Sequence, residues 1–216
     1  LLAEIERWGV EEEQHGAALA RWAELADSSF SFEKSLKDFQ AGYSIPMDVD
    51  ESTRGSRGGE LLARCVVETG TSSFYSAIRD ASDEPVLREI AARLAKDEFN
   101  HYKLFYDHFL RYEKDVPSKI RRLKIALGRV NEADDEELYY AYYCANTPAD
   151  SYDREGCAKA YQARALGLYQ RRHTDRLVAM IANACGIRIW SRVAKPLTSV
   201  VWWGFSNHAK RLAKAS

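Results

Sequence analysis

The stretch VEEEQHGAALARWAE, residues 10–24, decides how the fold is interpreted, because it interrupts its own helical pattern. Around it, one face of a predicted helix reads Leu1, Ile5, Trp8, Glu12, His15, Leu19 and Trp22. Glu12 and His15 therefore stand in a row of otherwise apolar residues. A charged carboxylate inside a protein core is costly unless another group compensates it. The rest of the sequence should supply that compensation.

Two later segments carry the same interruption. A predicted helix after the start signal SDEP has the face Leu87, Ile90, Leu94, Glu98, His101 and Phe105. A helix predicted from about residue 59 to about residue 80 has the face Leu61, Cys65, Glu68, Ser72 and Tyr75. Residues three apart on a helix share a face, so each Glu and its His can reach a common point.

A metal would compensate these buried carboxylates. Two Glu-x-x-His pairs, with single glutamates from the other two helices, are the ligand set of a carboxylate-bridged dinuclear centre in a four-helix bundle. Imidazole and carboxylate ligands together suit iron or manganese. The competing interpretation has no metal: each Glu would pair with an Arg or Lys, and each His would be a satisfied core residue.

Composition limits the remaining possibilities. The 216 residues are 46% hydrophobic and 29% charged, which is typical of a soluble globular protein. A net charge of −1 indicates no global attraction to nucleic acid or membrane. Four scattered cysteines suit a reducing cytosol, and no apolar run is long enough to span a bilayer. We therefore expect a cytoplasmic protein with no membrane span and no nucleic-acid partner.

The chain is predicted to be almost entirely helical. We expect the main helices at about residues 1–27, 59–80, 84–115, 152–185 and 195–214, with shorter ones between them. Gly186 is the expected C-cap of the fourth, and the Tyr-rich segment LYYAYYC is taken as helix. Asp134 and Glu137 are a candidate capping box. We place a metal-binding bundle at residues 1–116 and a helical extension that packs on it at residues 117–216.

The three interrupted helices resemble a known family. The motifs W…EEEQHG, ETGTSSF and AKDEFNH are similar to those of the soluble acyl-ACP desaturases of the ferritin-like superfamily. The resemblance covers about residues 1–115 and implies a ferritin-like four-helix bundle, here with additional C-terminal helices. It implies five metal ligands: Glu12, His15, Glu68, Glu98 and His101.

Two further residues match the family's motifs. Thr71 corresponds to the family's active-site threonine, although a threonine there can also bond back to its own helix. Asp97 corresponds to the Asp before a metal-binding Glu, and would orient a ligand His; the alternative is a solvent-facing charge.

The chain also departs from the family in two places. The family's first bundle helix brings another Glu, which would lie upstream of residue 1; we expect that helix to be missing, the alternative being substitution by Glu155 or another C-terminal acid. Everything after about residue 116 fails to resemble the desaturases, so the resemblance does not identify the substrate.

The resemblance implies a non-haem diiron oxidoreductase that activates O2 for C–H oxidation. Its cofactor would be two iron ions, with manganese or a mixed Mn/Fe pair as alternatives. The implied reaction is desaturation of an acyl chain on acyl carrier protein, with electrons from a ferredoxin, in a homodimer. A hydroxylase or N-oxygenase and a ferritin-like iron-handling protein are the alternatives. An oxygenase needs an apolar cavity beside the cluster, whereas iron handling needs an ion path.

Two further histidines and one basic segment are also candidate functional sites. His108 and His173 lie near predicted helix faces, and both are best explained as polar or core residues. The basic run SKIRRLKIALGR, residues 118–129, would dock an acidic carrier protein by charge complementarity or simply form a solvated face.

Overall fold

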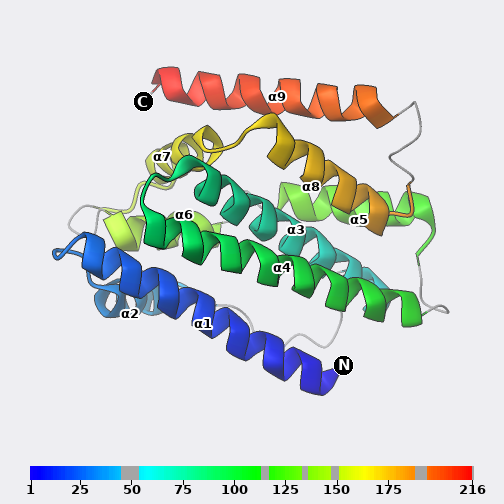
Figure 1. The fold of residues 1–216 in the computed structure, drawn as a ribbon, viewed down its shortest axis with the longest axis horizontal. Helices are drawn as coiled ribbons and strands as arrows, with labels where there is room; N and C mark the ends of the chain where they lie inside the picture. The colour runs from blue at the N-terminus through cyan, green and yellow to red at the C-terminus, as the bar shows by residue number, and fades with distance from the viewer. Residues whose placement is uncertain (45–53, 113–116, 133–135, 147–150, 188–193, 216) are drawn as a thin grey trace.

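A computed structural model describes residues 1–44, 54–112, 117–132, 136–146, 151–187 and 194–215, and all regular structure within these ranges is helical (Figure 1). The helices are α1 (Leu2–Ala26), α2 (Phe32–Gly42), α3 (Arg57–Ala81), α4 (Pro85–Arg111), α5 (Lys119–Asn131), α6 (Glu136–Asn146), α7 (Arg154–Gly167), α8 (Arg171–Ala184) and α9 (Ala194–Ala215). The all-α class is confirmed. None of these helices has the length and apolarity that crossing a bilayer demands.

Helices α3 and α4 form the centre of the fold and pack along their length as an antiparallel pair. Ser56 begins α3, since its hydroxyl accepts the backbone N–H of Gly59. The Glu84 carboxylate begins α4 by accepting the N–H groups of Val86 and Leu87, with Pro85 in the first turn. The expected start signal at SDEP is thus confirmed.

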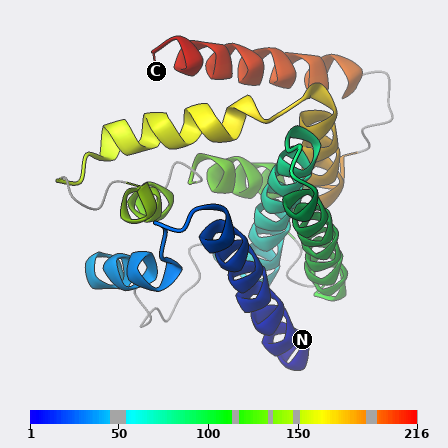
Figure 2. The same cartoon turned by 60° about the vertical axis from the view of Figure 1, so that its left-hand side comes forward.

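The main core lies where α3 and α4 meet the C-terminal helices. Its buried members are Leu61, Leu62, Ala63, Cys65, Tyr102, Phe105, Phe109, Ile125, Met180 and Ala184. Helices α5 and α8 both pack on α3, and α9 lies over α7 and α8. In Figure 2, α2, α6 and α7 form a second group beside α1, α3 and α4. The helices after residue 116 therefore pack on those before it.

One expected helix is two. We predicted a single helix over about residues 152–185, but α7 ends at Gly167 and α8 begins at Arg171. Between them Gln170 is extended, and its backbone N–H donates to Nδ1 of His173. The buried His173 ring also lies 2.9 Å from Asp80 on α3, so a side-chain contact between helices fixes the break.

Two other local predictions, the C-cap at Gly186 and the helix at the Tyr-rich segment, agree with the structure. Gly186 follows α8 with φ +72°, and the N–H of Ile187 reaches back to the carbonyl of Ala182, as a glycine C-cap requires. The Tyr-rich segment is helical as α6. Asp134 of the candidate capping box lies outside the described residues.

Candidate metal centre

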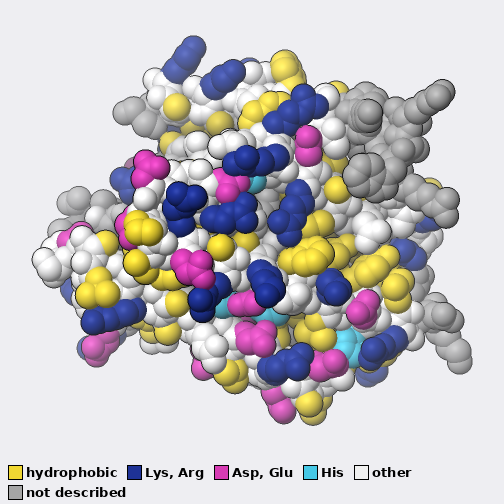
Figure 3. Space-filling view, in the orientation of Figure 1, with side chains coloured by type: hydrophobic (Ala, Val, Ile, Leu, Met, Phe, Trp, Pro, Cys, Tyr) yellow, Lys and Arg dark blue, Asp and Glu magenta, His cyan; other side chains and the backbone are white. Residues whose placement is uncertain are grey.

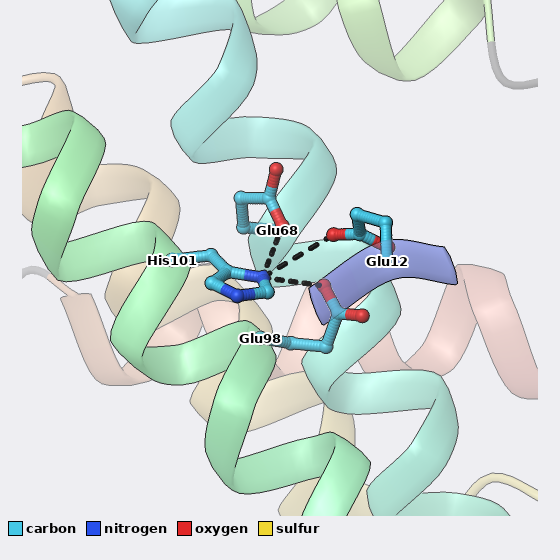
Figure 4. Close-up of side chains that lie close together, drawn as sticks. All are labelled: Glu12, Glu68, Glu98 and His101. Atoms are coloured by element: carbon cyan, nitrogen blue, oxygen red, sulfur yellow. Dashed lines mark ion pairs between the residues drawn. The ribbon is translucent and has the colours of Figure 1, made fainter. Parts of the chain in front are cut away.

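Helices α1, α3 and α4 bring four predicted ligands to one point. Glu12, Glu68, Glu98 and His101 each offer a ligand atom, and these atoms lie within 4.8 Å of one another (Figure 4). Glu68 and Glu98 are 1% exposed and His101 is 2% exposed. Each comes from the polar position that interrupts its helix's apolar face. The three interruptions therefore meet in space, in a group that could hold a metal ion.

Two of the carboxylates lie between two imidazoles. Glu12 places Oε2 3.6 Å from Nδ1 of His15 and Oε1 3.3 Å from Nδ1 of His101. Glu98 places Oε1 3.2 Å from the same His15 nitrogen and Oε2 3.9 Å from that of His101. The two rings lie 5.7 Å apart between centroids. Each carboxylate thus presents one oxygen to each side, which is how a bridging ligand is arranged.

Glu68 lies on one side of this arrangement. Its Oε2 is 3.7 Å from Nδ1 of His101, and its side chain comes from α3. Glu12 and Glu98 each approach both imidazoles, whereas Glu68 approaches only that of His101 among the described ion pairs.

An acid that precedes each Glu-x-x-His pair contacts the His of the other pair. Glu11 precedes Glu12 on α1, and its Oε2 lies 2.7 Å from Nε2 of His101 on α4. Asp97 precedes Glu98 on α4, and its Oδ2 lies 3.6 Å from Nε2 of His15 on α1. Both acids are partly exposed, so Asp97 faces solvent and a ligand ring at once.

Glu11 was not among the sequence-predicted residues. The sequence did contain a sign of its role. Glu11 directly precedes the candidate ligand Glu12, just as Asp97 directly precedes Glu98.

Thr71 lies inside the cluster. Its hydroxyl donates to Oε2 of Glu98 at 2.6 Å, and it also lies 3.3 Å and 3.2 Å from the carbonyl oxygens of Val67 and Glu68. A hydroxyl has one proton to donate, and the charged Glu98 oxygen is the nearest acceptor. Thr71 thus contacts both the backbone of its own helix and the candidate ligand Glu98. The contact with Glu98 is the shorter of the two kinds.

The cluster crowds negative charge into a buried space. Burial raises the pKa of Glu68 to about 8, and the neighbouring Glu98 carboxylate adds to this. Burial also works against ionised Glu98, yet His101 and His15 hold its pKa far below the usual range.

The imidazoles shift in the opposite direction. The Glu12 and Glu98 carboxylates raise the pKa of His15 to about 10. Burial opposes the charged form of His101, but Glu12, Glu68 and Glu98 outweigh it and raise its pKa to about 12. Positive charge on the two rings therefore offsets the carboxylates when only protons are bound.

The donor set fits a metal ion. Both nitrogens of His15 and Nδ1 of His101 are buried without a well-formed hydrogen bond. Among the described residues, the ion pairs of Glu12, Glu68 and Glu98 are with histidines, not with Lys or Arg. The metal-free interpretation required Lys or Arg partners. Carboxylate oxygens and imidazole nitrogens gathered in this way are possible metal ligands.

A hollow of about 300 Å³ opens between α1 and α4 and reaches His101. Its wall is mainly polar and consists of Glu4, Arg7, Trp8, Glu11, Asp97, Asn100, His101 and Leu104. In the space-filling view, His and acidic side chains meet along the seam between these helices (Figure 3). This lining is closer to the expected ion path than to an apolar substrate cavity.

The remaining candidates lie elsewhere. His108 is buried and pairs with Glu4 at the far end of the α1–α4 seam. Glu155, the alternative source of a further ligand, is exposed on α7 and pairs with Lys159 at 2.6 Å. Neither residue joins the cluster.

Comparison with protein-family models, with curated proteins and with solved structures gave no match.

Proposed function

We propose that this protein is a non-haem diiron oxidoreductase that activates O2 for C–H oxidation. The observation that carries the proposal is the placement of Glu12 and Glu98, each with one oxygen toward each of two imidazoles. Two Glu-x-x-His pairs with added glutamates are the ligand set of dinuclear carboxylate bundles. When bound, two iron ions would supply the electrons that reduce O2; manganese or a mixed Mn/Fe pair are the alternatives.

The chain's own residues would bind, orient and seal the centre. Glu12, Glu68, Glu98, His15 and His101 would hold the metal, with Glu12 and Glu98 each close to both imidazoles and Glu68 close to His101. Glu11 and Asp97 would orient the rings from outside. The Trp8 ring lies edge-on to both His101 and Phe105 and so would limit the movement of the His101 ring. The Thr71 hydroxyl would fix the Glu98 oxygen that it contacts and hold a proton within the site.

The resemblance suggests the reaction and the partners. The substrate would be an acyl chain carried on acyl carrier protein, the electron donor a ferredoxin, and the assembly a homodimer. A hydroxylase or N-oxygenase would use the same centre on a different substrate. Thr71 favours an enzyme, because iron storage alone does not require a hydroxyl bonded to a ligand carboxylate.

A second candidate function is iron handling, as in ferritins. The polar hollow that reaches His101 favours it, since Glu4, Glu11 and Asp97 line a route that a cation could follow. The two functions differ in stoichiometry. Under air, the enzyme should oxidise and keep two Fe²⁺ per chain, whereas an iron-handling protein should continue to oxidise and retain iron well beyond that amount.

Metal content tests the centre itself. We expect purified protein loaded anaerobically with Fe²⁺ to hold two ions per chain by elemental analysis, and Glu68→Gln to lose at least one. Glu89→Gln is the matched control, because Glu89 is exposed on α4 and pairs with Arg93.

The stability of Glu68→Gln toward urea is a second test. With chelator present, Glu68→Gln should unfold at the same or higher urea concentration than the parent, because it removes one crowded buried carboxylate. Substoichiometric iron in the parent, together with a Glu68→Gln variant that is clearly less stable, would establish a metal-free structural cluster instead.

A further inference from the structure

Helix α5 presents an apolar face that the described part of the fold leaves uncovered. Its inner side packs on α3, with Ile125 and Ala126 buried. Its outer side carries four exposed aliphatic residues: Ile120 (73% exposed), Leu123 (41%), Leu127 (56%) and Val130 (47%). Their spacing of three and four places them in one row, here named the α5 ridge. A purely solvated basic face would not expose such a row.

Within helix α5, the charged residues beside the ridge are all basic. The 13 residues of α5 include five Lys or Arg and no Asp or Glu. Lys119 and Lys124 are exposed and flank the ridge, whereas Arg121 donates to the carbonyl of Arg54. The whole chain is close to neutral at −1, so this positive charge is a local feature. The occupant of the ridge should therefore be apolar at its centre and negatively charged at its edge.

This charge pattern argues against a second copy of the chain. Two α5 ridges packed together would bring the Lys and Arg side chains that flank them close to one another, with no Asp or Glu of either α5 between them. Like charges brought together in this way weaken an interface.

The shape of the surface favours a plane over a partner helix. A partner helix usually lies in a groove between two helices, whereas the α5 ridge is the outer edge of one. Helix α9 shows a similar face: it has four Lys or Arg and no Asp or Glu, and it exposes Val200 (64%) and Trp203 (68%). Helices α5 and α9 run in the same direction on either side of α8 (Figures 1 and 2).

We infer that the α5 ridge binds the surface of an anionic lipid bilayer, with its aliphatic side chains at the boundary of the acyl chains. Exposed aliphatic residues bordered by Lys and Arg are the composition of helices that lie in a membrane interface. The basic border supplies attraction to anionic headgroups, and this attraction weakens as salt is added. The inference is independent of the chemistry at the metal centre.

Vesicle flotation tests it. The full chain should float with vesicles made of equal parts phosphatidylcholine and phosphatidylglycerol, and not with phosphatidylcholine alone. The double variant Leu123→Gln/Leu127→Gln should lower the bound fraction at least about tenfold, because it removes the centre of the ridge. Lys119→Gln/Lys124→Gln should weaken binding most at low salt.

The control is Val86→Gln, which changes an exposed aliphatic residue (56%) on α4, outside the ridge. It should bind vesicles like the parent, and circular dichroism should show every variant to be as helical as the parent.

Three results would overturn the inference. One is absence of flotation with the anionic vesicles, and another is undiminished flotation of the double Leu variant. The third is a complex with purified acyl carrier protein, or a dimer in sedimentation equilibrium, that the double Leu variant abolishes while vesicle binding is absent. That outcome would assign the α5 ridge to a protein partner.

Discussion

Glu11 shows how one partly exposed side chain can control a buried one. Its carboxylate contacts Nε2 of His101, while Nδ1 of the same ring faces Glu12, Glu68 and Glu98. An imidazole that binds metal through one nitrogen is fixed in orientation and tautomer by the hydrogen bond of the other. Glu11 is therefore a positioning residue for the metal centre.

Glu11→Gln should weaken metal binding without unfolding the protein. Loss of such an outer carboxylate lowers metal affinity about 10- to 100-fold. Anaerobic titration with Co²⁺, followed by its visible absorption, would measure this, and Asp97→Asn should act in the same direction through His15. Glu13→Gln, an exposed neighbour on α1, is the control. If Glu11→Gln binds Co²⁺ as tightly as the parent, the Glu11–His101 contact does not position the ring.

The five candidate ligands could be predicted from sequence because each interrupts an apolar row. A polar residue in a core position has a high energetic cost, and that cost makes it conspicuous. Glu11 has no such signal, since it lies beside the row and is partly exposed. Which carboxylates approach both imidazoles was also beyond the sequence, because that depends on how α1 and α4 cross. The match of Thr71 to a motif did not reveal that its hydroxyl reaches Glu98.

At the scale of helices, α3 and α8 are joined by a charged contact at the end of α3. Asp80 accepts from the Arg79 guanidinium and pairs with Arg172 at 2.8 Å and His173 at 2.9 Å. The hydroxyl of Ser73 adds a bond to the His173 carbonyl. The Arg79 guanidinium, with His173 and Arg172, holds the pKa of Asp80 well below its usual range, although burial opposes this.

This contact predicts a specific loss of stability in acid. The pKa of Asp80 is lower in the folded protein than in the unfolded chain, where it is about 4. Its contribution is therefore complete above that value and is lost as pH falls through and below it. Asp80→Asn should cost roughly 1 to 3 kcal/mol at neutral pH, the value of a hydrogen bond to a charged group, and much less in acid.

Urea unfolding of the metal-free parent and variant at several pH values would measure this difference. Asp83→Asn is the matched control, because Asp83 is exposed in the following turn. A cost for Asp80→Asn that stays constant from neutral pH into acid would contradict the assignment.

The same contact explains why the element prediction was wrong between residues 152 and 185. Apolar spacing continues across the α7–α8 junction, so periodicity alone predicts one helix. The break depends on His173, whose ring is bonded to the backbone of Gln170 and held by Asp80, about ninety positions earlier in the chain. A contact between distant residues cannot be read from a local pattern. The starts of α3 and α4 were predictable because their caps are local.

At the scale of the whole molecule, α1 is held to α4 by a few side-chain contacts, among them those of the candidate metal centre. Helices α3 and α4 share the apolar core with α5 and α8, whereas α1 packs mainly against α4. Away from the cluster, α1 reaches α4 through the Trp8–Phe105 ring contact and the bond from Trp22 to Glu84. Glu4 of α1 also pairs with His108 of α4, and in the cluster Glu12 and His15 of α1 pair with His101 and Glu98 of α4. Without metal, the attachment of α1 at the cluster depends on protons bound to the two imidazoles, which offset the carboxylates.

Metal should therefore fasten α1 to the rest of the molecule. We expect hydrogen exchange of the amides around Glu12 and His15 to be at least about tenfold slower in Mn²⁺-loaded protein than with chelator, since a ligand stabilises the state that binds it. Amides of α8, which contributes no residue to the candidate centre, should change little and serve as the internal control. Glu68→Gln should abolish the difference in α1 while leaving α8 unaffected. Equal exchange of α1 with and without metal would mean that packing against α4 alone holds the helix, and that the cluster contributes ligands but no stability to the fold.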